Sequence, residues 1–203
     1  MKYSVVILLG VLFFLSGCSY KEPFSSPYTG HDKNSQKRLE VVNTAQKYLY
    51  KKDGTDCSGF VMLVNQESYE PFFDAKKLPK FYEDSRRSLA MYRLFEADKR
   101  LYWDNPRIGD LVFFANTIKK YSTIKNIDNI THIGVIVKIE SDGTVQFIHH
   151  TRGQNMIGYL NMRYPEIAIN NGKMLNSYME KCPPKQSLAC LAPAYFSAFG
   201  AIK

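Results

Sequence analysis

Apolar residues are spaced along the chain in patterns that predict helices first and strands later. Between residues 37 and 50 they recur at about every third position, which is typical of an amphipathic helix packed on a core. A second apolar run from Phe60 predicts another helix, and residues 85–100 form a third helical stretch. Apolar residues fill positions 111–115, which indicates a strand. Positions 133–139 are almost continuously apolar and β-branched, which indicates a strand covered on both faces.

A hairpin follows from the next turn signal. Residues 141–143 read Ser-Asp-Gly, and apolar residues return in alternation over 144–150, so this segment predicts the partner strand. Helices at the N-terminal side and strands after them indicate an α+β fold, with helices packed on an antiparallel sheet of five or more strands. The aromatic tail, residues 195–202, is expected to dock on the same domain, because so many apolar side chains are rarely left in water.

The hairpin also decides which histidine faces which. Side chains alternate across a strand, so His132 shares a face with Gly134 and Ile136. A two-residue turn pairs His149 with Ile136, and a four-residue turn pairs it with Gly134. Either way His149 lies on the face of His132 and His150 points away, unless a bulge or an odd-length turn reverses the pattern.

The N-terminal residues predict a signal for export, not a part of the folded domain. The chain has 203 residues, of which 45% are hydrophobic, and this suits one domain with a short tail. Residues 1–17 hold one cation and an apolar segment too short to anchor in a bilayer, which predicts a removable signal peptide. Its end, Leu-Ser-Gly-Cys18, resembles a bacterial lipobox, so lipidation of Cys18 is expected, with an ordinary signal peptide as the alternative. Residues 18–34 predict a flexible tether, which leaves residues 35–203 as the folded domain.

The residue after Cys18 and the net charge bear on where the exported chain is located and what it contacts. Ser19 follows the cysteine, and by resemblance to lipoprotein sorting rules this favours the outer membrane, facing the periplasm. The formal net charge of +8 becomes +7 when Lys2 is removed with the signal. Export argues against nucleic acid as the partner, so the anions in reach are those of the envelope, including lipid head groups and peptidoglycan carboxylates. We expect a monomer without a cofactor.

One stretch, residues 54–61, carries the chemistry: it reads Gly-Thr-Asp-Cys-Ser-Gly-Phe-Val. Asp56 is expected to cap the following helix, because its carboxylate can accept the first N–H groups. Cys57 then lies at the positive end of the helix dipole, which favours a thiolate over a thiol. An activated cysteine needs a base, and His132 and His149 are both borne by predicted strands downstream.

These residues together resemble the NlpC/P60 family of cell-wall peptidases, which are papain-like thiol hydrolases. That family carries a Tyr ahead of Gly-x-Asp-Cys-Ser-Gly-Phe, then Gly-Asp-Leu-Val-Phe-Phe, then His-x-Gly-Ile/Val, then a second His after an apolar strand. The chain has all of these elements in the same order across residues 41–159: Tyr50, Asp56 to Phe60, Gly109 to Phe114, His132 to Val135, and Phe147 to His149.

The resemblance implies a role for each residue. His132 would take the proton of Cys57 to give a thiolate–imidazolium pair, and His149 would hydrogen-bond the other ring nitrogen of His132. The thiolate attacks an amide carbonyl, and the backbone N–H of Cys57 meets the oxyanion, with the Ser58 side chain or Tyr50 as further help. A buried free cysteine with two core histidines, and a packed aromatic at Tyr50, are the structural alternatives.

The two remaining cysteines are separate from this chemistry. Cys182 and Cys190 flank a short Pro-containing segment and are expected to form a disulfide, since an exported chain meets an oxidising compartment. A zinc site is the competing idea, but no second pair of ligands lies near them in the sequence. We therefore expect no metal site.

Three functions remain open on the sequence. The leading hypothesis is an exported peptidoglycan hydrolase that cuts an amide bond of the stem peptide, by resemblance after D-Glu and on the amino side of a diamino acid. A CHAP-like N-acetylmuramoyl-L-alanine amidase would use the same chemistry between the sugar and the peptide. A catalytically idle lipoprotein that binds the envelope is the third. Lipid acyl transfer occurs in relatives whose histidines come first, and here Cys57 precedes them.

Overall fold

The computed structural model describes residues 33–118, 126–179 and 190–203. The predicted signal peptide and Cys18 lie outside the described residues, as does Cys182. Helix α1 begins at Lys33, inside the segment expected to be the tether. No helix in the described ranges is long and apolar enough to cross a membrane.

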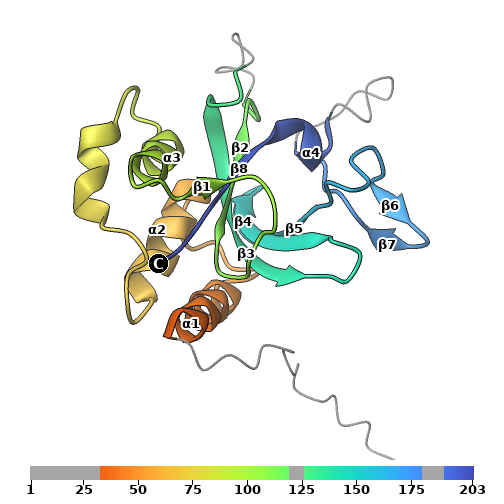
Figure 1. The fold of residues 1–203 in the computed structure, drawn as a ribbon, viewed down its shortest axis with the longest axis horizontal. Helices are drawn as coiled ribbons and strands as arrows, with labels where there is room; N and C mark the ends of the chain where they lie inside the picture. Colours follow the sequence, from red (N-terminus) through yellow and green to blue (C-terminus); the bar gives the residue numbers. More distant parts are fainter. Residues whose placement is uncertain (1–32, 119–125, 180–189) are drawn as a thin grey trace, which may run out of the picture. The chain divides into compact units, whose positions relative to one another are not determined.

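Helices come first along the chain and strands follow, as the hydrophobic pattern predicts (Figure 1). The helices are α1 Lys33–Lys47, α2 Cys57–Glu67, the 3₁₀ helix η1 Ala75–Phe81, α3 Arg87–Ala97 and α4 Ala192–Tyr195. The strands are β1 Leu101–Tyr102, β2 Leu111–Ala115, β3 Ile130–Ile139, β4 Val145–Thr151, β5 Gln154–Leu160, β6 Ile169–Asn170, β7 Lys173–Met174 and β8 Phe196–Gly200.

Six of the strands form one antiparallel sheet, in the order β1-β8-β2-β3-β4-β5. Strands β6 and β7 pair only with each other among the described residues. The α+β fold with an antiparallel sheet is therefore confirmed. The C-terminal tail docks as expected, because β8 inserts between β1 and β2.

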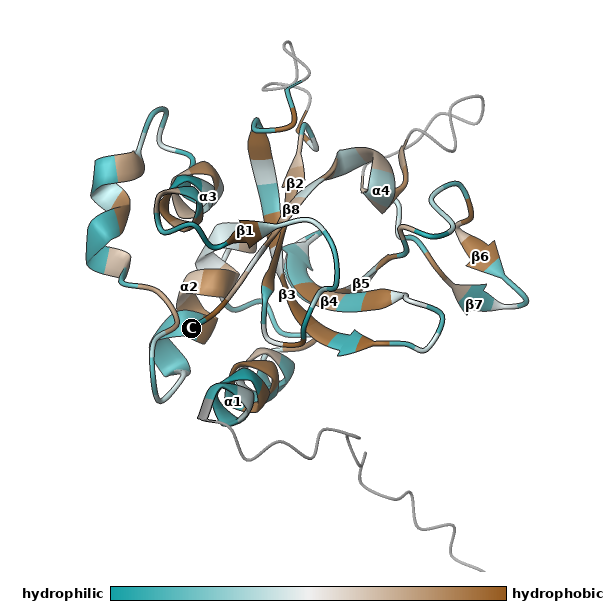
Figure 2. Cartoon of the chain, viewed as in Figure 1, coloured by the Kyte–Doolittle hydropathy of each residue, from teal (hydrophilic) through white to brown (hydrophobic). Residues whose placement is uncertain are grey.

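The sheet is covered on both faces, and strand alternation divides the core into two clusters. On β2, Leu111 and Phe113 belong to the cluster that α1, α2 and α3 cover, whereas Val112 and Phe114 belong to the cluster that includes Ala192 of α4. Figure 2 shows apolar residues along the central strands and on the side of α2 that meets them. A strand buried on both faces explains why residues 111–115 are apolar without interruption.

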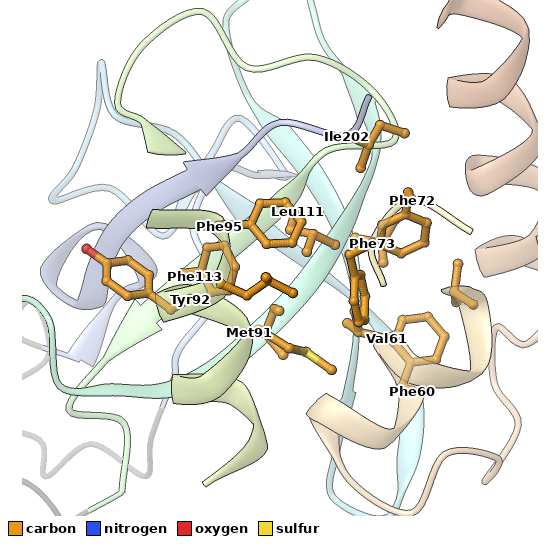
Figure 3. Packing of buried hydrophobic residues seen from close by; sticks show 14 of the residues in the cluster. Phe60, Val61, Phe72, Phe73, Met91, Tyr92, Phe95, Leu111, Phe113 and Ile202 are labelled. Carbon is orange, nitrogen blue, oxygen red and sulfur yellow. The ribbon is translucent and has the colours of Figure 1, made fainter. Parts of the chain in front are cut away.

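Aromatic rings fill the larger cluster between α2, α3 and β2 (Figure 3). Phe95 of α3 meets Phe113 of β2 edge to face, with 5.8 Å between ring centroids. Phe60 and Val61 of α2 are fully buried in the same cluster. Such edge-to-face contacts add stability beyond area burial. This packing fixes the axis of α2 against the sheet and so fixes where its first residue, Cys57, lies.

A buried ion pair joins the start of the sheet to α1 and the C-terminus. Asp110, which has no exposed surface, accepts hydrogen bonds from Arg38 Nη1 at 2.5 Å, from the Tyr102 hydroxyl at 2.5 Å and from Ile202 N–H at 2.8 Å. Arg38 also donates to the Ile202 carbonyl at 3.0 Å. Burial together with the Asp110 carboxylate raises the pKa of the Tyr102 hydroxyl above its usual range. Asp110 thus has a structural role: it joins α1, β1 and the C-terminal residues.

Candidate active site

The turn before α2 is built by two glycines whose backbones touch. A side chain at Gly54 would lie 2.5 Å from the Phe60 backbone, and one at Gly59 would lie 1.8 Å from the Gly54 carbonyl oxygen. Gly54 also has φ 94°, which glycine adopts without strain. Glycine at these two positions therefore lets the turn before α2 pack closely on the first turn of the helix. Cys57 lies between them in the sequence.

Asp56 caps α2 as predicted. Its backbone is extended, and its Oδ1 accepts the Gly59 N–H at 2.7 Å, while its carbonyl accepts the Phe60 N–H at 2.9 Å. Burial acts to raise the pKa of this carboxyl, but the hydrogen bonds from Gly59 and Ser58 outweigh it, so the pKa lies below its usual value. The cap is an anion at neutral pH.

Ser58 contributes to this cap. Its hydroxyl donates to Asp56 Oδ1 at 2.7 Å, and its side chain is buried. The hydroxyl proton of Ser58, which was expected to hydrogen-bond the oxyanion, is donated to Asp56 instead. We therefore assign Ser58 to holding Asp56, which in turn fixes the backbone on both sides of Cys57.

Cys57 lies at the first position of α2, beside the backbone N–H of Ile133 in β3. Burial, and next the Asp56 carboxylate, raise the pKa of the thiol to about 12, although the nearby N–H groups act in the opposite direction. The expectation that the helix start alone favours a thiolate is therefore corrected. The helix amides do stabilise the anion, but desolvation of the sulfur is the larger effect.

His132 and His149 lie against each other, with 2.6 Å between His132 Nε2 and His149 Nδ1 and ring planes at 86°. The turn has three residues, because Glu140 pairs with Thr144, and an odd-length turn alone would put His149 on the wrong face. The β3–β4 register also shifts between Ile136 and Lys138. Each irregularity moves the pairing by one residue, so the two cancel and the predicted facing of the histidines holds.

The contact between the histidines restricts their protonation. If His132 is to accept a proton at Nδ1, its Nε2 has to carry a hydrogen, which His149 Nδ1 then accepts. Burial first, and then the nearby His150, lower the pKa of His132 to about 4, while the Asp56 carboxylate acts to raise it. Burial and the two neighbouring imidazoles also hold the pKa of His149 well below its usual value. Both rings are neutral in the resting site at neutral pH.

The structure places Cys57 and His132 at adjoining elements without a hydrogen bond between them. Within the described ranges, no hydrogen bond joins Cys57 Sγ to His132. Catalytic hydrogen bonds are often long in free enzymes and tighten with substrate bound. A lone charge on either group is unfavourable here, so a proton leaving Cys57 has to stay in the site, on His132.

Asn155 is a residue of this region that the sequence reasoning missed. It is fully buried at the start of β5, and its Nδ2 donates to the carbonyls of Tyr48 at 3.0 Å and Asp53 at 3.2 Å. Its Oδ1 contacts His150 Nδ1 at 3.0 Å. Asn155 thereby holds the segment between α1 and the Cys57 turn against the sheet. An Asn at the start of a strand gives no local signal of contacts with residues 102 and 107 positions away in the chain.

Tyr50 belongs to the segment that Asn155 holds. Its backbone N–H donates to the Asn155 carbonyl at 2.8 Å, and Asn155 N–H donates back to Lys51 at 2.7 Å. Tyr50 has φ 62°, and 65% of its surface is exposed. The packed-aromatic alternative is therefore wrong for Tyr50, whereas its contact with substrate stays a prediction.

The other cysteines and the metal question are separate from this cluster. Cys57 is a free thiol, and Cys190 is buried and disulfide-bonded. The expected partner, Cys182, lies outside the described residues, so that pairing stays a prediction. In the part of the chain that the structure describes, no group of three or more His, Cys, Asp or Glu side chains is arranged to hold a metal ion.

Comparison with known proteins matches the part of the chain that holds Cys57, His132 and His149. The sequence profile of the NlpC/P60 family matches residues 45–170, a range that contains all three residues. Comparisons with curated proteins and with solved structures found no match. The family match covers more than half of the 203 residues, and the mixed fold of helices with an antiparallel sheet is consistent with it. The chain belongs to the NlpC/P60 family.

Proposed function

We propose that the chain is an exported peptidoglycan hydrolase that cleaves an amide bond of the cell-wall stem peptide through Cys57 and His132. The NlpC/P60 family is one of cell-wall peptidases and hydrolases, which supports the coarser part of this proposal. The observation that carries the finer part is the 2.6 Å contact between His132 and His149, beside a cysteine that begins a capped helix. His149 contacts Nε2 of His132 and orients its ring, which leaves Nδ1 of His132 to act as the base.

The first half of the reaction forms an acyl-enzyme. As Cys57 attacks the amide carbonyl carbon, its proton passes to His132 Nδ1, and the C–S bond forms while the carbonyl oxygen becomes an oxyanion. Among the described residues no backbone carbonyl accepts the Cys57 backbone N–H, and we propose that it donates to that oxyanion. His132 then gives its proton to the amine, the C–N bond breaks, and the amine leaves a thioester on Cys57.

The second half restores the enzyme. Water attacks the thioester carbonyl, and His132 takes the proton of the water, so the C–S bond breaks and the thiolate leaves. The proton on His132 returns to Cys57, and the acid product departs. Throughout, the Nε2–H of His132 keeps its hydrogen bond to Nδ1 of His149. The lowered pKa of His149 keeps that ring neutral, so it remains an acceptor.

We further propose that the enzyme works at the envelope as a lipid-anchored monomer. The lipobox-like end of the signal supports anchoring through Cys18, and residues 18–34 supply the tether. Ser19 favours the outer membrane, facing the periplasm. Labelling of cells with a radioactive or clickable fatty acid tests this step, because Cys18→Ala is expected to abolish incorporation while Cys57→Ala leaves it unchanged.

Digestion of purified peptidoglycan tests the activity. The wild-type domain is expected to release fragments with a shortened stem peptide, detected by mass spectrometry, and Cys57→Ala and His132→Ala are expected to release none. Tyr50→Phe tests the predicted contact of Tyr50 with substrate, because it removes the hydroxyl and leaves the backbone hydrogen bonds with Asn155 in place.

The products separate the alternatives. Free lactyl groups with intact stem peptides would instead identify the CHAP-like amidase. No product from the wild type, together with retained binding to the wall, would identify the non-catalytic lipoprotein and overturn the hydrolase proposal.

A further inference from the structure

A cavity of about 440 Å³ opens at the turn between β3 and β4, and Val145, the first residue of β4, forms part of its wall. Of the described active-site residues, neither Cys57 nor the two contacting histidines line it, since His132 and His149 line a separate cavity. Val145 and His149 lie four positions apart on β4, which at about 3.3 Å per residue places them about 13 Å apart. The cavity at the β3–β4 turn is therefore a second site, away from the reacting groups.

An exposed tryptophan lies at the rim of this cavity. Trp103 is the single tryptophan of the chain, and 61% of its surface is exposed although it lines the cavity. The residue before it is fixed, because Tyr102 pairs with Phe199 in the sheet and its hydroxyl donates to the buried Asp110. The Phe199 side chain also lines the cavity. An indole that follows a fixed strand and is mostly in water is a flat apolar surface for a ligand, and its N–H can donate a hydrogen bond.

Polar side chains from three segments of the chain line the same cavity. They are Asp104 and Asn105 from the loop after β1, Ser141 from the β3–β4 turn and Arg163 from the loop after β5. Within the described ranges, none of these four side chains makes a hydrogen bond or an ion pair. Arg163 lies against Gly143, where a side chain would come within 3.1 Å of its Nε and 3.3 Å of its Cζ. The donors and acceptors of these four side chains are thus left for a ligand.

The charges of the cavity favour a neutral ligand. Its lining holds two carboxylates, Asp104 and Glu140, and one guanidinium, Arg163. Glu140 is already engaged, because it accepts hydrogen bonds from Lys138 Nζ and Gln146 Nε2, both at 2.7 Å. An anionic ligand would meet the Asp104 carboxylate, and a cationic ligand would meet the Arg163 guanidinium, so either charge is opposed. A neutral ligand with an apolar face and an edge of hydroxyl and amide groups avoids both penalties.

We propose that this cavity binds an N-acetylhexosamine ring of the peptidoglycan glycan strand. The apolar C–H face of the sugar stacks on the Trp103 indole, and its hydroxyl groups hydrogen-bond to Asp104 and Arg163. The acetyl methyl group contacts Met162, of which 49% is exposed beside them. The inference rests on the proposed function, because that function brings the chain to the cell wall. It adds a contact that holds the domain on the glycan while Cys57 cleaves the peptide.

The single tryptophan makes this binding directly measurable. Tri-N-acetylchitotriose serves as the probe, and the wild-type emission of Trp103 is expected to shift to shorter wavelength and to saturate as the sugar covers the indole. Unchanged emission with this saccharide overturns the inference. A shift with vesicles of anionic phospholipid but none with the saccharide also overturns it, and would assign the surface to the membrane.

Calorimetry with the same saccharide tests the residues. Trp103→Ala is expected to weaken binding about tenfold or more, the contribution of a stacked aromatic ring, and Arg163→Gln to weaken it less strongly. The fold should tolerate Trp103→Ala because that side chain is mostly exposed, and thermal unfolding checks this. Tyr69→Ala is the control, since it removes a tyrosine that is 90% exposed and lines neither cavity. Equal affinity of Trp103→Ala and the wild type contradicts the assignment.

Cleavage separates failure of this inference from failure of the proposed function. Trp103→Ala is expected to raise the concentration of intact peptidoglycan needed for half-maximal rate about tenfold, and to leave cleavage of a sugar-free stem peptide unchanged. Equal losses on both substrates would mean that Trp103 acts through the active site or the fold, which ends the inference. If the wild type cleaves neither substrate, the hydrolase proposal fails, and the saccharide titration still decides whether the cavity binds the sugar.

Discussion

His150 contacts Asn155, with 3.0 Å between Nδ1 and Oδ1, while its neighbour in β4, His149, contacts His132. Two adjacent histidines of one strand thus serve different parts of the molecule. His150 contacts Asn155, which holds the segment that leads to Cys57, whereas His149 orients the base. Their sequence positions differ by one, so strand alternation alone separates the two roles.

Substitution of the two histidines is expected to have unequal effects on turnover. His149→Ala removes the acceptor for His132 Nε2–H and is expected to lower kcat about 100-fold, the usual contribution of an oriented general base. His149→Gln keeps an acceptor and should retain part of this. His150→Gln keeps a contact to Asn155 and should lower kcat far less. Steady-state cleavage of a stem peptide measures all three, and a larger loss in His150→Gln than in His149→Ala would contradict the assignment.

Alkylation of Cys57 reports on the proton transfer directly. In the intact site burial raises the pKa of the Cys57 thiol to about 12, and without His132 no neighbouring base can take its proton. His132→Ala is therefore expected to slow the reaction with iodoacetamide at pH 7 about 100-fold, with a rate that still rises above pH 9. Intact-protein mass spectrometry gives the rates, with His150→Gln as the control. Equal rates in wild type and His132→Ala would mean that His132 does not receive the proton.

The lowered pKa of His132, a partly buried side chain, makes the stability of the fold depend on pH. Burial lowers the pKa of His132 from 6.5 to about 4, so between these values the unfolded chain binds a proton that the folded chain does not. Stability therefore falls as pH falls from 6.5 to 4, by about 3 kcal/mol for this residue. Urea unfolding at pH 7 and pH 4.5 is expected to show a smaller acid loss in His132→Asn than in wild type. His31→Asn, in the predicted tether, should lose as much stability as the wild type.

Asn155 is expected to matter for stability as well as for the site. Asn155→Ala leaves the Tyr48 and Asp53 carbonyls and the His150 ring without their partner, which should cost about 2–4 kcal/mol in urea unfolding. Hydrogen exchange should also become faster in residues 48–56, which Asn155 holds. Asn170→Ala changes an exposed asparagine in β6 and is the control. Equal stability of the two variants would contradict the anchoring role.

Local patterns predicted the parts of the molecule that local forces determine. The Asp56 cap and the helix that begins at Cys57 follow from capping and periodicity within a few residues. His149 faces His132 as predicted only because the three-residue turn and the register shift in β3–β4 cancel. The ionisation of Cys57 did not follow, because desolvation depends on what packs around the sulfur rather than on the helix start.

The long-range contacts carried no such signal. Asn155 reaches carbonyls 102 and 107 positions away, and the wall at Met174 and Met179 of the cavity beside His132 and His149 forms only when the C-terminal region folds against β5. No periodicity or residue spacing in the sequence predicts either contact. The family resemblance was also silent on them, since it concerns the residues of the motif.

The buried ion pair of Asp110 with Arg38 is expected to matter for stability. Asp110→Asn removes the charge that Arg38 faces in a buried position, and is expected to cost about 3–5 kcal/mol of unfolding free energy, because Arg38 stays buried without its partner. Replacing both residues, Arg38→Met with Asp110→Leu, should cost less than Asp110→Asn alone. Asp142→Asn is the matched control, since Asp142 pairs with Lys173 at 2.7 Å but is partly exposed, and it should cost less than about 1 kcal/mol. A double variant less stable than Asp110→Asn would show that the pair contributes net stability rather than only a penalty when broken.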